Sequence, residues 1–271
     1  MDWRAFTVAV EGASIAGEVR GEPPALALLH GFGGDRHGWD AVTAALPPAL
    51  GLLRYDQRGF GESAQAESIA FSHAEDLLAL LDARGIKRIA LAGLSQGGAI
   101  AAHFALEHPE RVDKLILVAP ALMGWEWSDE WRGHWRAMVR AARSGDMDGA
   151  RALWWQHPLF ATCRSGDAGA MLRCEIERFA GCQWIADPQH PVLPDVERLH
   201  ELAMPVLLLT GGRDMPDFQL IASLLEASAP DLRRVDFADA GHMLPLERPA
   251  DVAREIAAFL SGEALSPSPA P

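Results

Sequence analysis

The sequence is poor in the features that mark secreted, membrane-spanning and disulfide-stabilised proteins. Its 271 residues include only three cysteines, and this odd number favours free thiols in a reducing compartment. The first residues lack a basic segment followed by an apolar run, and no apolar stretch is long enough to cross a bilayer. We therefore expect a cytoplasmic protein without a signal peptide or a membrane contact.

Positive charge is also scarce and is not clustered. The formal net charge is −13 and there is no Lys/Arg run, so neither nucleic acid nor an anionic membrane surface is an expected partner. A metal site built on Cys163, Cys174 and Cys182 would need a fourth ligand at a suitable spacing, and the sequence offers none. Buried or semi-buried thiols are the expected state of all three.

Apolar residues, by contrast, make up 49% of the chain, enough for one large core. Strand-like runs alternate with helical periodicity, which predicts an α/β fold with a mostly parallel eight-stranded sheet and helices on both faces. The predicted strands cover residues 3–10, 13–20, 25–29, 51–56, 88–93, 114–119, 205–210 and 232–237. The predicted helices of this core cover residues 39–46, 72–84, 96–107, 217–228 and 249–260.

One segment interrupts the alternation. Residues 121–195 lack a strand pattern and instead predict helices near 128–143, 145–156 and 167–180. Seven of the nine tryptophans of the chain lie here. We interpret residues 1–120 and 196–262 as the core, the insertion as a helical cap over the carboxyl edge of the sheet, and the Ser/Pro-rich residues 263–271 as a disordered tail.

The sequence Gly93-Leu94-Ser95-Gln96-Gly97 joins a predicted strand to a predicted helix. Only small residues at Gly93 and Gly97 allow so sharp a turn, which exposes the Ser95 hydroxyl and points the first free helix N–H groups at it. The pattern alone is weak, since it arises by chance about 0.1 times in a chain of this composition. The strand before it and the helix after it supply the context that a nucleophile needs.

A serine nucleophile requires a base, normally a histidine oriented by a carboxylate. His242 is the best candidate among ten histidines, because it follows the last predicted strand on a Gly-containing loop. For the acid, Asp214 directly follows the strand at 205–210, and Asp217 is its rival. We prefer Asp214 because it lies nearer the end of the strand, although either residue could instead cap the next helix.

A tetrahedral intermediate also needs two N–H donors. We expect one from the amide of Gln96 and the other from the amide of Phe32, in the Gly-rich loop after the strand at 25–29. Glycines beside Phe32 would let that backbone approach the substrate closely. His30 is expected to orient the loop rather than to carry a proton.

Several segments together resemble the α/β-hydrolase superfamily and occur in its order. They are His30-Gly-Phe-Gly33, Asp56-Gln-Arg-Gly-Phe-Gly-Glu-Ser63, Gly93-Leu-Ser-Gln-Gly-Gly98, His108-Pro-Glu-Arg-Val112, Gly211-x-x-Asp214 and Gly241-His242. By this resemblance Ser95, Asp214 and His242 match the catalytic triad of the family. Phe32 and Gln96 match its oxyanion hole.

Two subfamilies share further segments with this chain. The nucleophile segment and the run at 108–112 resemble enol-lactonases and small esterases. Segments 30–39 and 154–160 are similar instead to the menaquinone-pathway cyclohexadiene-carboxylate synthases. Those lyases place a tyrosine before the nucleophile and an arginine just after its Gly-Gly pair, where this chain has Leu94 and Ala99. The missing cation argues against a polycarboxylate substrate.

The expected activity is hydrolysis of a small-to-medium carboxylic ester with an apolar portion, using water and an acyl-enzyme on Ser95. No metal or organic cofactor is implied. An enol-lactonase or a carbon–carbon bond hydrolase with the same triad remains an alternative, as does a non-catalytic ligand receptor. Aromatic residues of the insertion should contribute an apolar pocket. The pocket candidates are Trp125, Trp154, Trp155, Phe160 and Met243.

Overall fold

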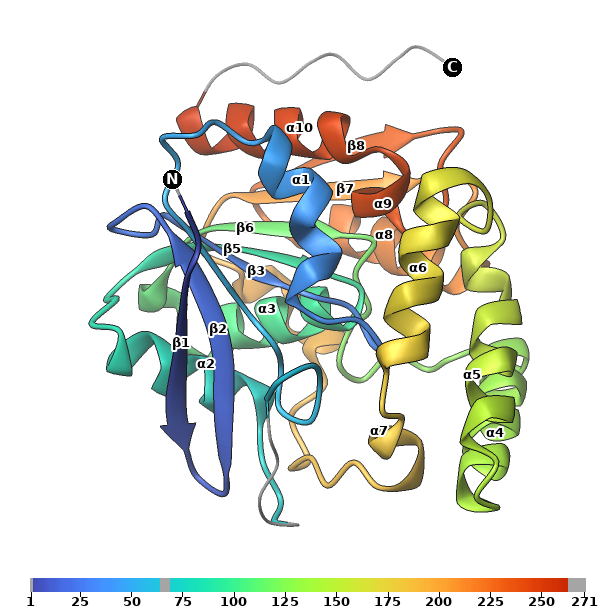
Figure 1. The fold of residues 1–271 in the computed structure, drawn as a ribbon. Coiled ribbons are helices and arrows are strands. Elements are labelled where there is room, and N and C mark those ends of the chain that lie inside the picture. The colour runs from blue at the N-terminus through green and yellow to red at the C-terminus, as the bar shows by residue number, and fades with distance from the viewer. Residues whose placement is uncertain (1, 64–68, 263–271) are drawn as a thin grey trace.

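A computed structural model describes residues 2–63 and 69–262 of the chain. Eight strands form one sheet in the order β1-β2-β4-β3-β5-β6-β7-β8 (Figure 1). β3 to β8 run parallel, whereas β2 is antiparallel to both β1 and β4. The strands are β1 (Arg4–Val10), β2 (Ala13–Arg20), β3 (Leu26–Leu29), β4 (Leu52–Tyr55), β5 (Ile89–Leu94), β6 (Val112–Val118), β7 (Val206–Gly211) and β8 (Leu232–Phe237).

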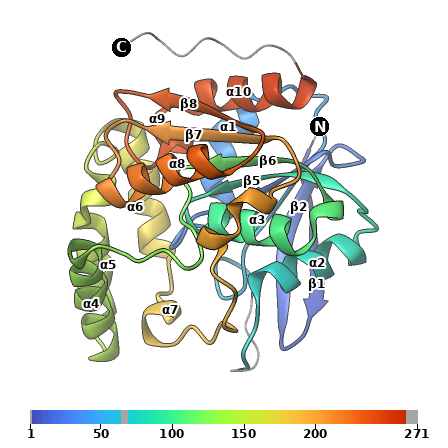
Figure 2. The ribbon, with the colours of Figure 1, turned by 180° about the vertical axis from the view of Figure 1, so that it is seen from behind.

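Helices cover both faces of this sheet, because alternate side chains of each buried strand point to opposite faces. Leu26 and Leu28 belong to the core on one face, and Ala27 and Leu29 to the core on the other. Figures 1 and 2 show the two helical layers from opposite sides. The first core includes side chains of α1 (Asp40–Ala45) and α10 (Pro249–Ser261), and the second those of α2 (His73–Ala83), α3 (Gln96–Glu107) and α8 (Pro216–Ser228).

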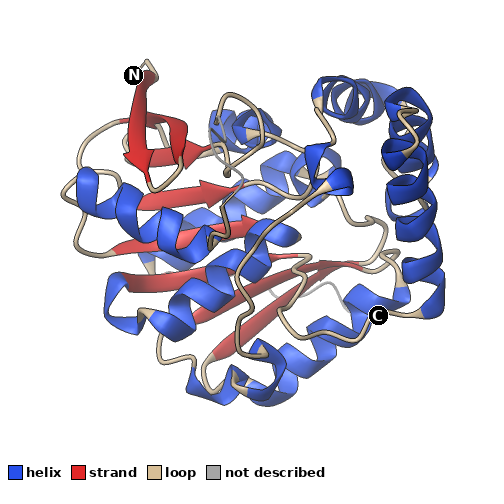
Figure 3. Cartoon of the chain, turned by 90° about the horizontal axis from the view of Figure 1, so that it is seen from below, coloured by secondary structure: helices blue, strands red, loops and turns tan. Residues whose placement is uncertain are grey.

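A helical insertion separates β6 from β7. It contains α4 (Asp129–Arg143), α5 (Met147–Gln156), α6 (Gly166–Arg178) and the short α7 (Cys182–Ile185). Figure 3 shows these helices beyond the tips of the strand arrows, at the carboxyl edge of the parallel strands. Side-chain caps begin two of them: Ser128 accepts a hydrogen bond from Trp131 N in α4, and Asp146 accepts one from Gly149 N in α5.

The predicted fold class is confirmed, and all eight predicted strands exist within about two residues of their expected ends. Two short helices, α7 and α9 (Leu244–Glu247), were not predicted, because single turns carry too little periodicity to be recognised. Residues 263–271, for which a disordered tail was expected, lie outside the described residues. Within the described residues, no helix combines the length and apolarity needed to cross a membrane.

The three cysteines are free thiols. Only Cys163 is buried, whereas Cys174 and Cys182 are exposed, so the expectation of buried thiols was wrong for these two. Burial raises the pKa of Cys163 to about 12, which keeps this thiol protonated and unreactive at neutral pH.

Candidate active site

The turn from β5 into α3 holds Ser95 in a strained backbone conformation. Its φ of 53° and ψ of −115° lie outside the regions that residues with side chains usually adopt. A Cβ at Gly93 or Gly97 would overlap backbone atoms, including at Gly97 the carbonyl of Leu29 in β3. Glycine is therefore required at both positions, and the turn places the Ser95 side chain against a cavity at the carboxyl edge of the sheet.

Asp214 and His242, the acid and the base of the sequence analysis, are in direct contact. His242 Nδ1 donates to Asp214 Oδ2 over 2.8 Å, and the two side chains are only 1% and 3% exposed respectively. Within the described residues, His242 Nε2 has no hydrogen-bond partner, and His242 lines the same cavity as Ser95. Donation from Nδ1 leaves Nε2 as the basic nitrogen of the neutral ring, able to accept a hydroxyl proton.

Close packing of two loops brings this acid and base together. A Cβ at Gly211, at the end of β7, would overlap the carbonyl of Gly241 in the histidine loop. Arg213 N donates to the carbonyl of Ala240 over 2.9 Å. Glu247 in α9 accepts two amides of the histidine loop, at 2.9 and 3.1 Å. The unpredicted helix α9 thus fixes the loop that carries the base.

Asp217, the rival acid, makes contacts of a different kind. Its carboxylate accepts hydrogen bonds from Ser128 N at 3.0 Å, Ser128 Oγ at 2.6 Å and Trp125 Nε1 at 3.2 Å. These bonds occupy both carboxylate oxygens and join α8 to the beginning of the helical insertion. The geometry favours Asp214 as the partner of His242 and gives Asp217 an anchoring role.

The Gly-rich loop after β3 forms a tight turn close to Ser95. Gly34 N donates to the carbonyl of Gly31 over 3.2 Å, and Gly33 has a φ of 78°, a conformation that favours glycine. A Cβ at Gly31 would lie 3.4 Å from the Cβ of Ser95. No hydrogen bond from the N–H of Phe32 or of Gln96 reaches another described residue outside the helices and strands. Two free amides near a nucleophile suit a developing oxyanion.

Hydrogen bonds among His30, Gln57 and Gln96 support this turn. Gln57 N donates to His30 Nε2 over 3.0 Å, and His30 Nδ1 donates to the carbonyl of Gly31 over 2.8 Å. Burial lowers the pKa of His30 and keeps the ring neutral. Gln96 Nε2 donates to Gln57 Oε1 over 2.8 Å. Both ring nitrogens of His30 are therefore committed to positioning the loop.

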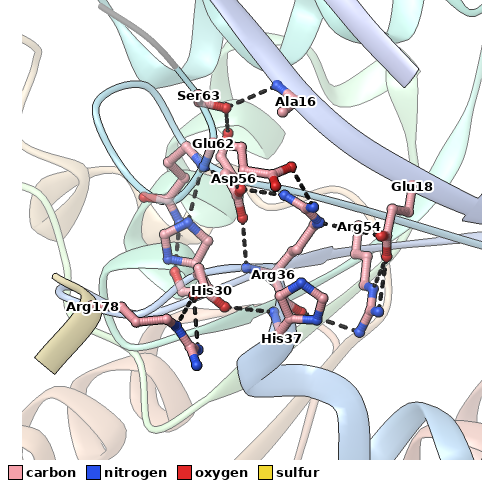
Figure 4. Close-up of polar contacts among 12 residues, drawn as sticks. Ala16, Glu18, His30, Arg36, His37, Arg54, Asp56, Glu62, Ser63 and Arg178 are labelled. Atoms are coloured by element: carbon pink, nitrogen blue, oxygen red, sulfur yellow. Dashed lines mark hydrogen bonds and ion pairs between the residues drawn. The ribbon is translucent and has the colours of Figure 1, made fainter. Parts of the chain in front are cut away.

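A charged cluster fixes the next part of the same loop (Figure 4). Asp56, directly after β4, accepts from Arg36 N at 2.7 Å and Glu62 N at 2.8 Å, and pairs with the guanidinium of Arg36. Beside it, Arg54 pairs with Glu18 at 2.9 Å. The buried Arg36–Asp56 pair ties the segment after β3 to the segment after β4, and the Arg54–Glu18 pair ties β4 to β2.

One cavity of about 510 Å³ lies at this edge of the sheet. Ser95, Phe32, Gln96 and His242 line it, as do apolar side chains from the helical insertion. Of the predicted pocket residues, the cavity is lined by Trp154, Phe160 and Met243. The volume suits a small ligand with a largely apolar body.

The family model for the alpha/beta hydrolase fold matches residues 24–249. The chain belongs to this family and is a hydrolase of the α/β-hydrolase superfamily.

Some relatives of this hydrolase match most of its chain, and others match less than half of it. A putative carbamate hydrolase, RutD, from Klebsiella pneumoniae (strain 342) is 29% identical over 232 residues, 81% of this chain and 84% of its own. A pimeloyl-[acyl-carrier protein] methyl ester esterase from Aeromonas hydrophila is 37% identical over 125 residues, 44% of this chain and 46% of its own. The crystal structure of a hydrolase from Pseudomonas aeruginosa PA01 has a TM-score of 0.78 at 25% identity, and the match covers 96% of this chain and 98% of that one.

Two of the pocket tryptophans predicted for this hydrolase lie elsewhere. Trp125 donates its indole N–H to Asp217, and Trp155 stacks under the guanidinium of Arg173 at 4.2 Å, so neither lines the cavity. Sequence reasoning missed four tryptophans that do. They are Trp39, Trp127, Trp131 and Trp135. Trp131 and Trp135 lie one turn apart on α4, and this spacing could have indicated their shared face, whereas Trp127 precedes the helix and stacks on Trp131.

Glu175 is a further cavity residue that the sequence analysis did not identify. It lies on α6 and is 7% exposed. Burial, together with the charge of Asp35, raises the pKa of Glu175 from 4.5 to about 8. The carboxyl is therefore mostly protonated at neutral pH.

The buried carboxyl predicts a pH-dependent stability difference. A folded-state pKa above the unfolded value makes the wild type lose stability as pH rises from about 5 to 8, because unfolding then releases a proton. Glu175→Gln carries no such proton. We expect the free energy of unfolding of Glu175→Gln, relative to that of wild type, to increase as pH rises over this range, by roughly 3–5 kcal/mol at pH 9.

Urea unfolding at pH 5, 7 and 9 measures this difference. Glu177→Gln is the matched control, because Glu177 is an exposed residue of the same helix. Its stability difference from wild type should stay nearly constant with pH. A difference for Glu175→Gln that is equally constant would show that this carboxyl ionises at an ordinary pH.

The hydrolase contains a second His–carboxylate pair away from Ser95. His103 Nδ1 in α3 lies 2.9 Å from Asp195 Oδ1, and this bond raises the pKa of His103. His103 lines an adjoining cavity of about 290 Å³ and not the one that contains Ser95. This pair therefore joins α3 to the end of the helical insertion, and the histidine that lines the cavity of Ser95 is His242, paired with Asp214. No cluster of three or more potential metal ligands occurs within residues 2–63 and 69–262.

Proposed function

We propose that this protein is a serine hydrolase that cleaves a small-to-medium carboxylic ester with an apolar portion. The observation that carries the proposal is that the strained Ser95 and His242 line one cavity, with His242 held from behind by a hydrogen bond to Asp214. The methyl ester esterase among its relatives supports ester chemistry. The helical insertion, residues 121–195, serves as a cap on a core formed by residues 1–120 and 196–262.

Acylation begins when the ester carbonyl lies against Ser95. His242 Nε2 takes the hydroxyl proton as Ser95 Oγ attacks the carbonyl carbon, and Asp214 stabilises the resulting imidazolium. The carbonyl oxygen gains negative charge and accepts hydrogen bonds from the amides of Phe32 and Gln96. The C–O bond to the alcohol then breaks, and the imidazolium gives its proton to the leaving oxygen.

Deacylation repeats these steps with water. His242 removes a proton from a water molecule, which attacks the acyl carbon and forms a second tetrahedral intermediate on the same two amides. This intermediate expels Ser95 Oγ, which recovers its proton from His242. The ester and one water molecule are thus converted into a carboxylic acid and an alcohol, and these steps use no cofactor.

The direct test is detection of the acyl-enzyme. The protein is mixed with 4-nitrophenyl butanoate, the release of nitrophenol is followed in the first turnovers, and acid-quenched samples are digested for mass spectrometry. We expect a butanoyl group on the peptide that contains Ser95. Turnover with no acylated peptide at any quench time, or acylation at another residue, would contradict the proposed mechanism.

The cavity predicts that the cap determines the chain-length preference. Trp154 lines the cavity and contacts the rings of Phe32 and Phe160, with centroids 5.8 and 4.8 Å away. Each methylene buried in an apolar pocket contributes about 0.8 kcal/mol, so kcat/KM should rise about fourfold per carbon until the pocket is full. Trp154→Ala enlarges the pocket and should move the optimum to longer acyl chains.

Trp155→Ala is the matched control, because the neighbouring ring stacks on Arg173 outside the cavity. The measurement is kcat/KM for 4-nitrophenyl esters from acetate to octanoate. We expect the Trp155→Ala profile to parallel that of wild type. If the Trp154→Ala profile were also parallel, Trp154 would contribute only to packing of the cap.

A further inference from the structure

Glu175 is one of the polar residues of the cavity that the proposed mechanism does not use. The Glu175 side chain enters the cavity from α6, is more than nine-tenths buried, and makes no hydrogen bond with any described residue. Much of the surrounding cavity wall is apolar, including the neighbouring Leu172 and Ile176. A buried carboxyl without a partner is costly, and such groups tend to serve a ligand.

Glu175 and Ser95 flank the same Gly-rich turn. A Cβ at Gly31 would lie 3.4 Å from the Cβ of Ser95, and a Cβ at Gly34 would lie 3.4 Å from Glu175 Oε2. The hydrogen bond from Gly34 N to the carbonyl of Gly31 closes this turn, and the first and last Cα atoms of such a turn are under about 7 Å apart. A short acyl chain attached to Ser95 could therefore reach the carboxyl of Glu175.

Burial, and then the negative charges of Asp35 and Asp40, favour the neutral form of Glu175. Asp35 and Asp40 repel a negative charge there, and Arg178, the nearby cation, is bound to Asp35 at 3.0 Å. The thiol of Cys163 stays protonated. A neutral carboxyl offers an O–H donor, and in an apolar cavity such a donor selects strongly for a substrate that carries an acceptor.

We propose that Glu175 is a specificity-determining residue that donates a hydrogen bond to an uncharged oxygen on the acyl chain, a few carbons from the scissile carbonyl. This inference rests on the proposed function and narrows its substrate class to esters of oxo-substituted or similarly oxygenated acids. An anionic group directly beside Glu175 is disfavoured, because Asp35 and Asp40 repel it as they repel a charge on Glu175. A purely alkyl chain would leave the carboxyl without a partner.

The test compares two pairs of 4-nitrophenyl esters, 4-oxopentanoate with pentanoate and 5-oxohexanoate with hexanoate. The quantity measured is the ratio of kcat/KM for the oxo ester to that for the alkyl ester. Intrinsic differences in ester reactivity cancel when this ratio is compared between protein variants. Hydrolysis of pentanoate by wild type tests the proposed function separately, so its failure is distinguishable from failure of this inference.

Two substitutions separate the effect of the hydrogen-bond donor at position 175 from the effect of side-chain size. Glu175→Gln keeps a donor of similar shape, and the ratio for the better pair should stay within about threefold of wild type at pH 7. Glu175→Met removes the donor, and the ratio should fall about tenfold while hydrolysis of the alkyl ester is retained. An unchanged ratio in Glu175→Met would overturn the proposal.

A pH series keeps the proposal testable even if Glu175→Met fails to fold. Ionisation of Glu175 removes its donor, so the wild-type ratio should fall between pH 7 and 9, while the ratio of Glu175→Gln should stay constant. Equal pH dependence of the two ratios would overturn the proposal. So would a preference for the ester of 5-aminopentanoic acid that Glu175→Gln loses, because it would show that Glu175 binds a cation as a carboxylate.

Discussion

Replacing Ser95 with alanine is expected to lower kcat for 4-nitrophenyl butanoate by about 10⁴- to 10⁶-fold, because the hydroxyl is the only nucleophile that the proposed acyl-enzyme can use. The fold should be retained. Gly93 and Gly97, which determine the shape of the turn, are unchanged, and alanine lacks only the hydroxyl oxygen. Steady-state kinetics with enzyme free of wild-type contamination measures the loss.

Ser223→Ala is the control for this experiment, because Ser223 is an exposed serine on α8. Its kcat should match that of wild type, and the thermal unfolding midpoints of all three proteins should agree within a few degrees. Activity of Ser95→Ala within about tenfold of wild type, a barrier difference of only ~1.4 kcal/mol, would exclude Ser95 as the nucleophile.

The sequence predicts this region well because backbone geometry restricts it so strongly. At Gly93 and Gly97 a side chain would overlap neighbouring backbone, so the spacing of these glycines in the sequence directly indicates the turn. The buried parallel strands are equally easy to predict, because a strand covered on both faces is a short continuous apolar run in the sequence. The order of strands and helices then brings the loops with Asp214 and His242 to the same edge of the sheet as Ser95.

The cavity wall could be predicted only in part. Trp154 and Trp155 are adjacent, and successive residues of an α-helix differ by about 100° in direction, so one faces the cavity and the other does not. Sequence composition places tryptophan in the insertion but leaves the rotation of each helix open. The spacing of Trp131 and Trp135 indicates which face of α4 is aromatic, whereas no comparable repeat exists in α5.

Glu175 could not be predicted at all. Glutamate is rarely buried, so its place on a helix with charged neighbours suggests an exposed residue. Its burial arises from tertiary packing, since α6 sits over the Gly-rich loop and Gly34 and Gly38 leave room for the carboxyl. Departures of this kind from local expectation are common at functional sites.

The two candidate acids should differ sharply in their effect on catalysis. Asp214→Asn is expected to lower kcat about 10⁴-fold, because an amide at this position no longer favours the N–H on His242 Nδ1 and no longer stabilises the imidazolium. Asp217→Asn keeps a group of the same shape between Trp125 and Ser128, although the new amide N–H₂ replaces one acceptor oxygen. Its kcat should stay within about tenfold of wild type, with a loss of roughly 1–3 kcal/mol in stability.

The measurement is kcat for 4-nitrophenyl butanoate, with thermal unfolding of each variant. These readouts separate the two roles, since Asp214→Asn should lose rate with little change in melting temperature and Asp217→Asn should show the opposite pattern. A greater rate loss in Asp217→Asn would assign the acid to α8 and contradict our choice. The contact geometry makes that outcome unexpected, because Asp217 directs both oxygens at the beginning of the helical insertion, whereas Asp214 Oδ2 lies 2.8 Å from the ring that must carry the proton.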